Sequence, residues 1–174
     1  MKKLIALLLA VLLIALTACE TPPPADNQNS TPSGSNSGTN NQTPGETFRF
    51  TYENVALIPG AAFDPSVLPE ADDVYTVPSC AIEGTDNVYS YPVLELTAYN
   101  DGTGEVIYSI YLTDPDTPTE EGLYVGDDLA RVTELYGTDY SENGTELIFT
   151  KGSTCLCLIM NGETVISIEY RMVV

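Results

Sequence analysis

The second half of the chain alternates apolar and polar residues over short runs, which is the pattern of half-buried β-strands. Five runs have this pattern: 91–99, 105–112, 146–150, 154–160 and 164–172. Turn-forming residues separate neighbouring runs, most clearly in the segment 100–104 and at Asn161-Gly162. The pattern therefore predicts antiparallel hairpins.

One segment has the period of a helix instead. From Asp127 to Tyr136, apolar residues recur at spacings of three and four, as at Leu129 and Val132. Asp127 is a suitable N-cap, and Gly137 suits the left-handed conformation that ends many helices. We expect a helix over 127–136.

The two halves of this region resemble each other. The run VIYSIYL at 106–112 matches TVISIEY at 164–170, and ALIPG at 56–60 matches GLYVG at 122–126. In the first half, Asp64 and Pro65 are able to start a helix, which Pro69 ends early.

The fold class that follows is α+β. We expect two tandem repeats, at about 48–116 and 117–174, each a helix followed by three strands. The repeats form one antiparallel sheet with helices on one face, within a single acidic domain spanning 48–174.

The N-terminus has the features of a secretory signal. Met1-Lys2-Lys3 precedes an apolar stretch from Leu4 to Ala18, which is shorter than the ~20 residues of a membrane-spanning helix. Leu16-Thr17-Ala18-Cys19 resembles the lipobox of bacterial lipoproteins. The resemblance implies that residues 1–18 are removed, that Cys19 is the lipid attachment site, and that the domain is held at the extracytoplasmic face of the membrane.

Residues 19–47 comprise this cysteine and a predicted disordered tether. From Thr21 onwards the segment consists almost entirely of Pro, Gly, Ser, Thr, Asn and Gln, with Ala25 as its one aliphatic side chain. Such a composition buries too little apolar surface to offset the entropy of ordering. We expect a flexible spacer.

Charge excludes one class of partner. All 25 acidic residues follow the predicted cleavage site, whereas Lys2 and Lys3 precede it, so the mature chain keeps four basic residues and a balance of −21. Phosphate backbones repel such a chain, so nucleic acid is excluded as a partner. Solubility outside the cell is a sufficient explanation of the acidity.

Three cysteines remain after Cys19, and an odd number leaves at least one unpaired in the monomer. Cys155 and Cys157 share one face of a predicted strand, about 6.6 Å apart, which suits a mutual disulfide poorly. Cys80 remains open as a partner for either of them. Without histidine, three thiols are a weak zinc signature, and we predict neither a metal nor a cofactor.

The sequence also offers little for catalysis, because histidine, the commonest general base, is absent. Lys151 and Ser153 lie in a predicted turn without a catalytic motif. Adjacent carboxylates are interpreted as solvated loop and cap residues: Asp72/Asp73, Glu120/Glu121 and Asp127/Asp128. Asp114 and Asp116 are a candidate calcium pair, although their spacing matches no calcium loop.

Tyrosines alternate along the predicted strands, so some must face outward. They are Tyr89, Tyr91, Tyr99, Tyr108 and Tyr111. Exposed tyrosines on a sheet are able to bind protein or sugar, although tyrosine also simply favours strands.

Four segments carry a family resemblance: Pro78–Asp86, Glu121–Asp127, Tyr136-Gly137 and Ser167–Tyr170. They resemble tandem-repeat lipoprotein domains similar to beta-lactamase-inhibitor protein and to small outer-membrane assembly lipoproteins. Within that group the chain most resembles an uncharacterised set of lipoproteins from Gram-positive gut bacteria. The resemblance implies a fold and a cell-surface location, and no catalytic residues.

The expected function is a membrane-anchored, non-enzymatic binding or adaptor module that engages another envelope protein through its sheet. An extracytoplasmic hydrolase that uses carboxylates or a cation is an alternative, and a structural spacer is another. The sequence leaves a glycan or small-molecule ligand open.

Overall fold

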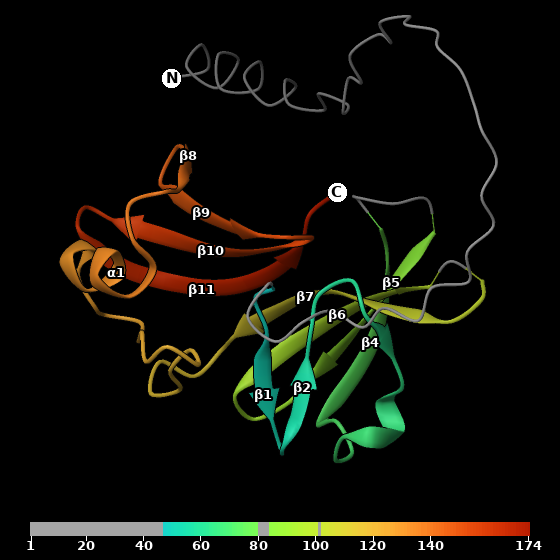
Figure 1. The fold of residues 1–174 in the computed structure, drawn as a ribbon. Coiled ribbons are helices and arrows are strands. Elements are labelled where there is room, and N and C mark those ends of the chain that lie inside the picture. The colour runs from blue at the N-terminus through green and yellow to red at the C-terminus, as the bar shows by residue number, and fades with distance from the viewer. Residues whose placement is uncertain (1–46, 80–83, 101) are drawn as a thin grey trace, which may run out of the picture. The chain divides into compact units, whose positions relative to one another are not determined.

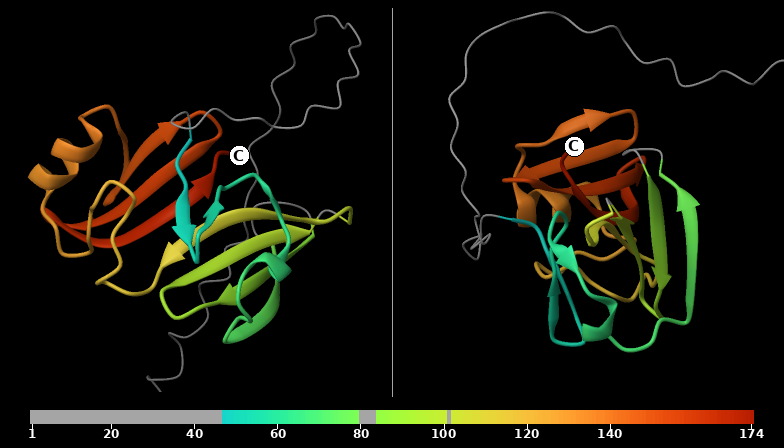
Figure 2. Two further views of the ribbon diagram at one scale, coloured as in Figure 1. Left: turned by 60° about the horizontal axis from the view of Figure 1, so that its bottom comes forward. Right: turned by 90° about the vertical axis from the view of Figure 1, so that its right-hand side faces the viewer.

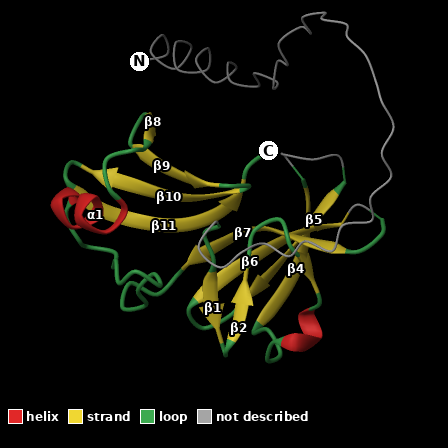
Figure 3. Ribbon diagram, in the orientation of Figure 1, coloured by secondary structure: helices red, strands yellow, loops and turns green. Residues whose placement is uncertain are grey.

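The computed structural model describes residues 47–79, 84–100 and 102–174. The predicted signal peptide, Cys19, the tether up to residue 46 and Cys80 lie outside these residues. The described chain is predominantly β-structure (Figure 3). Its strands are β1 (Phe50–Tyr52), β2 (Val55–Leu57), β3 (Ala62–Phe63), β4 (Asp73–Pro78), β5 (Thr85–Ser90), β6 (Leu94–Asn100), β7 (Glu105–Leu112), β8 (Ser141–Asn143), β9 (Glu146–Lys151), β10 (Thr154–Asn161) and β11 (Thr164–Met172).

Nine of these strands form one antiparallel sheet, in the order β4-β5-β6-β7-β11-β10-β9-β8, with β3 pairing β7 beside that path. The sheet consists of two four-stranded meanders, β4 to β7 and β8 to β11, which can be followed in Figures 1 and 2. The last strands of the two meanders, β7 and β11, pair with each other through three residues each. The strands β1 and β2 form a separate hairpin.

The predicted α+β class with helices on one face is wrong. The described residues contain a single α-helix, α1 (Leu129–Tyr136), and a short 3-10 turn, η1 (Pro65–Val67), where the first helix was expected. Asp64 caps η1 and Pro65 occupies its first position, as predicted, and Pro69 follows its end and prevents its extension. The first half contributes five strands to the main sheet, β3 to β7, and the second half contributes four, β8 to β11, rather than three each, so the fold is mostly β.

Helix α1 agrees with the prediction in its body and its end. Its N-cap is Asp128 rather than Asp127, because the Asp128 carboxylate accepts a hydrogen bond from the backbone N–H of Arg131 at 2.8 Å. The carboxylate of Asp127 instead accepts from the backbone N–H of Tyr124 in the preceding loop. Gly137 ends the helix with a φ of 81°, a conformation that glycine adopts without strain.

The core lies on one face of the sheet. Fully buried side chains of the central strands, such as Leu96, Ile110 and Ile168, pack there with Val132 of α1. The β1–β2 hairpin adds Phe50 and Leu57, and the segment after η1 adds Leu68. Helix α1, the segment after η1 and this hairpin therefore contribute side chains to the same hydrophobic core.

Matching β-bulges occur in the two meanders. The register shifts between Thr97 and Ala98, which leaves Tyr108 of β7 as an extra residue, and between Ile159 and Met160, which leaves Ile166 of β11 as an extra residue. Tyr108 and Ile166 occupy the same place in the similar runs VIYSIYL and TVISIEY.

The segments preceding these strands also make matching backbone hydrogen bonds. Gly60 donates to the carbonyl of Ile107 at 2.7 Å, and Gly126 donates to the carbonyl of Val165 at 2.8 Å. In both cases the strand residue donates back, at 2.9 Å, to the carbonyl of the residue after the glycine. The local structure is thus the same at both places, although a helix follows only in the second.

Candidate functional site

The face of the sheet opposite the core has a different composition. Cross-strand pairs place their side chains on the same face, and one row of pairs on this face crosses the sheet from β4 to β9. Its members are Asp73, Ser90, Glu95, Tyr111, Glu169, Cys157 and Ile148. The adjacent row contains Tyr75, Val88, Thr97, Ser109, Arg171, Cys155 and Thr150. We call the surface formed by these two rows the open face.

A pair of thiols lies where β10 crosses the open face. Cys155 and Cys157 are 7% and 2% exposed, and both are free thiols. Their sulfur atoms lie 3.6 Å apart, with the Cys157 thiol donating to the sulfur of Cys155. The prediction that they share a face without forming a mutual disulfide is confirmed.

Arg171 of β11 contacts this pair. Its Nη2 and Nε atoms lie 2.8 and 3.1 Å from the sulfur of Cys157, so one guanidinium donates two hydrogen bonds to it. Nη2 also donates to a carboxylate oxygen of Glu146, and Nη1 lies 3.8 Å from a carboxylate oxygen of Glu169. The guanidinium therefore bridges the sulfur of Cys157 and two carboxylates, that of Glu169 on its own strand and that of Glu146 on β9.

These contacts shift the ionisation of the thiols. The pKa of the Cys155 thiol is lowered to about 7, first by the hydrogen bond from Cys157 and further by the charge of Arg171, against the effect of burial. The pKa of the Cys157 thiol is raised by the same hydrogen bond and by burial. The pair consequently loses one proton readily and holds the second strongly.

The pKa values of the Glu169 carboxyl group and the Arg171 guanidinium are shifted as well. Burial raises the pKa of Glu169, against the lowering effects of a hydrogen bond with Ser109 and the charge of Arg171. Burial alone lowers the pKa of Arg171, but the charges of Cys157, Glu169 and Glu146 raise it overall. The guanidinium therefore remains charged.

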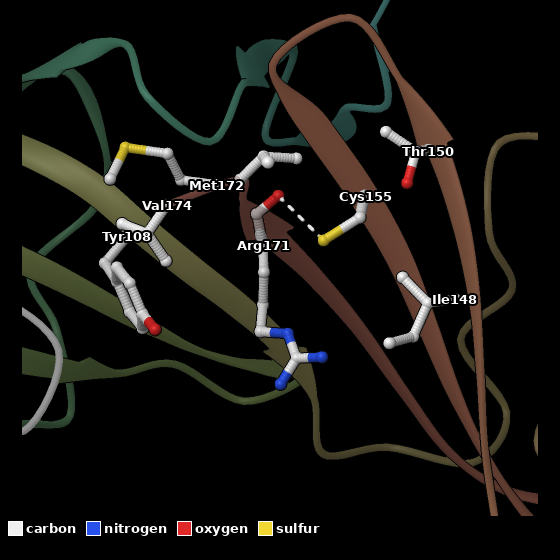
Figure 4. Close-up of a pocket in the computed structure, with 8 residues that line it drawn as sticks. Tyr108, Ile148, Thr150, Cys155, Arg171, Met172 and Val174 are labelled. Atoms are coloured by element: carbon white, nitrogen blue, oxygen red, sulfur yellow. Dashed lines mark hydrogen bonds between the residues drawn. The ribbon is translucent and has the colours of Figure 1, made fainter. Parts of the chain in front are cut away.

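A cavity of about 270 Å³ opens beside Cys155 (Figure 4). Its wall includes Tyr108, Ile148, Arg171 and the C-terminal residue Val174, which is 80% exposed. The thiol of Cys155 lies toward this cavity and donates to the backbone carbonyl of Arg171 at 3.5 Å. Small molecules or ions therefore have a route to an otherwise buried thiol.

Several other residues that the sequence offered as candidate site residues make structural contacts instead. Asp114 accepts hydrogen bonds from the backbone N–H of Asp116 and the hydroxyl of Thr117, which closes its own loop. Lys151 lies 3.9 Å from a carboxylate oxygen of Glu121 and over the ring of Phe48. In the part of the chain that the structure describes, no three potential ligands among Asp, Glu and Cys form a metal-binding group.

The adjacent carboxylates also separate. Glu120 accepts from Arg49 and Thr51, whereas Glu121 accepts from the hydroxyl of Tyr136 and lies near Lys151. Asp127 and Asp128 bond to different backbone groups, as described above. Asp72 and Asp73 lie at the start of the edge strand β4. In the pairs Glu120/Glu121 and Asp127/Asp128, the two carboxylates therefore bind different groups.

The tyrosines divide between the two faces. Tyr89 and Tyr91 are buried, and the hydroxyl of Tyr89 donates to Glu105 at 2.7 Å. Tyr111 is 38% exposed on the open face, where Tyr75 of β4, which the sequence analysis did not single out, is 43% exposed. The prediction that some tyrosines face outward is confirmed at Tyr111.

Comparison of the chain with protein-family models, curated proteins and solved structures gave no match. Across residues 47–79, 84–100 and 102–174, no helix is long and apolar enough to cross a membrane.

Sequence reasoning identified the two thiols but missed Arg171, Glu146 and Glu169 beside them. The alternation of apolar residues on β11 was an available signal, since Ile168 and Tyr170 are core residues and Glu169 and Arg171 lie between and after them. The same alternation on β10 assigns both cysteines to the face away from the core.

Proposed function

We propose that this chain is a lipid-anchored extracytoplasmic module whose open face binds a basic protein of the cell envelope. The observation that carries the proposal is the distribution of charge. Each of the four basic side chains of the described residues lies within 4 Å of a carboxylate: Arg49, Arg131, Lys151 and Arg171. Many acids have no such partner, so the charge available to a partner is negative.

The open face supplies a place where this charge and apolar contact coincide. Asp73 and Glu95 share a row with Tyr111, and Tyr75 lies in the adjacent row. Tyrosine is enriched at protein interfaces because its ring offers a large contact area and its hydroxyl stays hydrated. A cationic surface rich in Lys or Arg is complementary to this arrangement.

The membrane anchor belongs to the same proposal and has a separate test. Lipid modification of Cys19 places the protein in the membrane fraction, and Cys19→Ser is expected to remove both membrane association and incorporation of a labelled fatty acid. Fractionation of the host cells together with metabolic labelling measures both. Membrane association that survives Cys19→Ser contradicts the anchor.

Cross-linking in the host cells, followed by mass spectrometry, tests the partner. We expect repeated capture of one basic envelope protein, reduced at least about tenfold by Tyr75→Ala combined with Tyr111→Ala. Tyr124→Ala is the matched control, because Tyr124 is 43% exposed but lies in the loop before α1 rather than on the sheet. Capture should be unchanged in this variant.

Binding of the captured protein to the purified full chain completes the test. Its affinity should fall as ionic strength rises, because the attraction is between exposed charges. The proposal fails if capture is insensitive to the two open-face tyrosines. It also fails if the affinity of the purified pair does not depend on salt.

A further inference from the structure

We propose that Cys155 and Cys157 form a two-coordinate binding site for a soft monovalent cation, Cu(I) or Ag(I). This site lies on the open face but does not rest on the proposed function, because its residues differ from the tyrosines and carboxylates assigned to the partner. Its basis is the geometry of two buried thiols, the residues around them and the route to them from solvent.

The position of the thiols within β10 opposes a disulfide between them. Residues two apart on a strand are separated by about 6.6 Å, with side chains nearly parallel, whereas a disulfide brings the two Cβ atoms to about 3.8 Å. Strand β10 pairs along its length with β9 on one side and β11 on the other, so it cannot buckle without loss of ladder hydrogen bonds. The two sulfurs nevertheless lie only 3.6 Å apart.

A cation between the sulfurs requires a smaller adjustment. Two metal–sulfur bonds of about 2.3 Å span at most about 4.6 Å, so side-chain rotation that separates the sulfurs by roughly 1 Å is sufficient. The backbone of β10 need not move. The strand therefore holds the two thiols near the spacing that a bridging ion needs and away from the spacing of a disulfide.

The ligand set selects the class of ion. Thiolates are soft ligands that favour Cu(I) and zinc over calcium or magnesium. A structural zinc site needs four protein ligands, but the chain has no histidine, and no group of three potential ligands occurs among the described residues. The carboxylate of Glu146 is already bonded to Arg171. Two sulfurs without further ligands suit a monovalent d¹⁰ cation, which is stable in linear coordination.

The charges around the pair complete the argument. Binding converts two thiols and one monovalent cation into a complex with one negative charge and releases two protons, or one proton where a thiolate is already present. Arg171 donates two hydrogen bonds to the sulfur of Cys157 and so compensates this negative charge. The cavity beside Cys155 admits the ion, while burial excludes water from the sulfurs.

Titration of the reduced, full-length protein with Cu(I) under anaerobic conditions tests the site, with a chromophoric Cu(I) chelator as competitor. We expect one Cu(I) per chain, bound by two sulfur atoms in X-ray absorption spectra, and the same stoichiometry for Ag(I). Cys155→Ser and Cys157→Ser should each weaken binding at least about 100-fold. Arg171→Met should weaken it about tenfold, as expected of a group that supports the ligands without coordinating the ion.

Of the two other cysteines, Cys19 is the proposed lipid attachment site, and Cys80 provides the control. Cys80→Ser should leave both stoichiometry and affinity unchanged, and circular dichroism with thermal unfolding shows whether each variant is folded. If a serine variant fails to fold, blocking of Cu(I) uptake in the wild type by stoichiometric Hg(II), mapped to Cys155 and Cys157 by mass spectrometry, tests the same site. Binding that persists in the Cys155→Ser/Cys157→Ser double variant overturns the proposal, as does binding that requires Cys80 or favours Zn(II) over Cu(I).

Discussion

Ile166 and Ile168 lie two residues apart on β11 but in opposite environments. Ile166, the extra residue of the bulge, is 51% exposed, whereas Ile168 is fully buried in the core. We expect Ile168→Ala to lower the free energy of unfolding by about 2–5 kcal/mol, because it removes apolar burial and leaves a cavity. Ile166→Ala should change it by less than about 0.5 kcal/mol. Urea denaturation of both variants measures the difference.

The comparison is informative because the two changes are chemically identical and lie two residues apart on one strand. Without the bulge, strand alternation would place the two side chains on the same face. Equal destabilisation by both substitutions would therefore contradict the bulge and, with it, the register that places Arg171 opposite Cys155.

Glu169 makes stability depend on pH in an unusual direction for a carboxylate. Because burial raises its pKa in the folded protein above the ordinary value of 4.5, the folded state binds its proton more tightly than the unfolded state. Stability from this group is therefore gained as pH falls through the raised pKa and is absent at higher pH. Relative to Glu169→Gln, the wild type should become more stable between pH 7 and pH 5.

Denaturation of wild type and Glu169→Gln at both pH values measures this difference. Glu142→Gln, which changes an exposed carboxylate on β8, is the control and should follow the wild type. If the wild type instead loses stability relative to Glu169→Gln on acidification, the ion pair with Arg171 outweighs burial at this position.

At the scale of elements, the start of α1 depends on one carboxylate. Asp128→Ala removes the hydrogen bond to the N–H of Arg131 and should lower the free energy of unfolding by about 1 kcal/mol. Asp128→Asn keeps an acceptor at the same place and should retain most of the stability. Thermal unfolding of the two variants distinguishes them. Equal losses would mean that the charge, rather than the capping hydrogen bond, stabilises the helix start.

The alternation of apolar and polar residues predicted those strands that have one face in the core. The bounds of β7 and β11 agree with the prediction, and β9 and β10 differ by one residue at an end. The edge strand β4 was missed because nearly all its side chains are exposed, so no apolar alternation marks it. Strand β5 was missed because Asp86 and Asn87 have low intrinsic β-propensity. Pairing with β4 on one side and β6 on the other stabilises this strand despite that low propensity.

The candidate site was only half predictable for a related reason. If β10 and β11 paired without interruption from Asn161 and Thr164 at their turn, Cys155 would lie opposite Tyr170. Arg171 would then lie on the opposite face of the sheet from Cys155. The bulge beside Ile159 shifts the register by one and places Arg171 opposite Cys155. A sequence shows which side chains alternate, but the position of an extra residue depends on how the two strands fit the same core.

At the scale of the whole molecule, negative charge is the dominant electrostatic feature. The four basic residues after Lys3 face 25 acids, and each of the four is engaged in an ion pair within the described structure. Folding brings the remaining carboxylates closer together, so their mutual repulsion opposes the folded state. The same repulsion keeps the chain soluble and selects a cationic partner.

Salt should therefore stabilise this protein. Raising NaCl from 10 to 150 mM shortens the Debye length from roughly 30 Å to about 8 Å, which screens repulsion between distant carboxylates more than it screens contacting pairs. We expect the melting temperature of the purified full chain to rise over this range. Asp139→Lys combined with Glu142→Lys, two exposed positions without a basic neighbour in the described ion pairs, should reduce the dependence. A melting temperature that falls with salt would mean that the four ion pairs outweigh the repulsion, and the argument for a cationic partner would lose its basis.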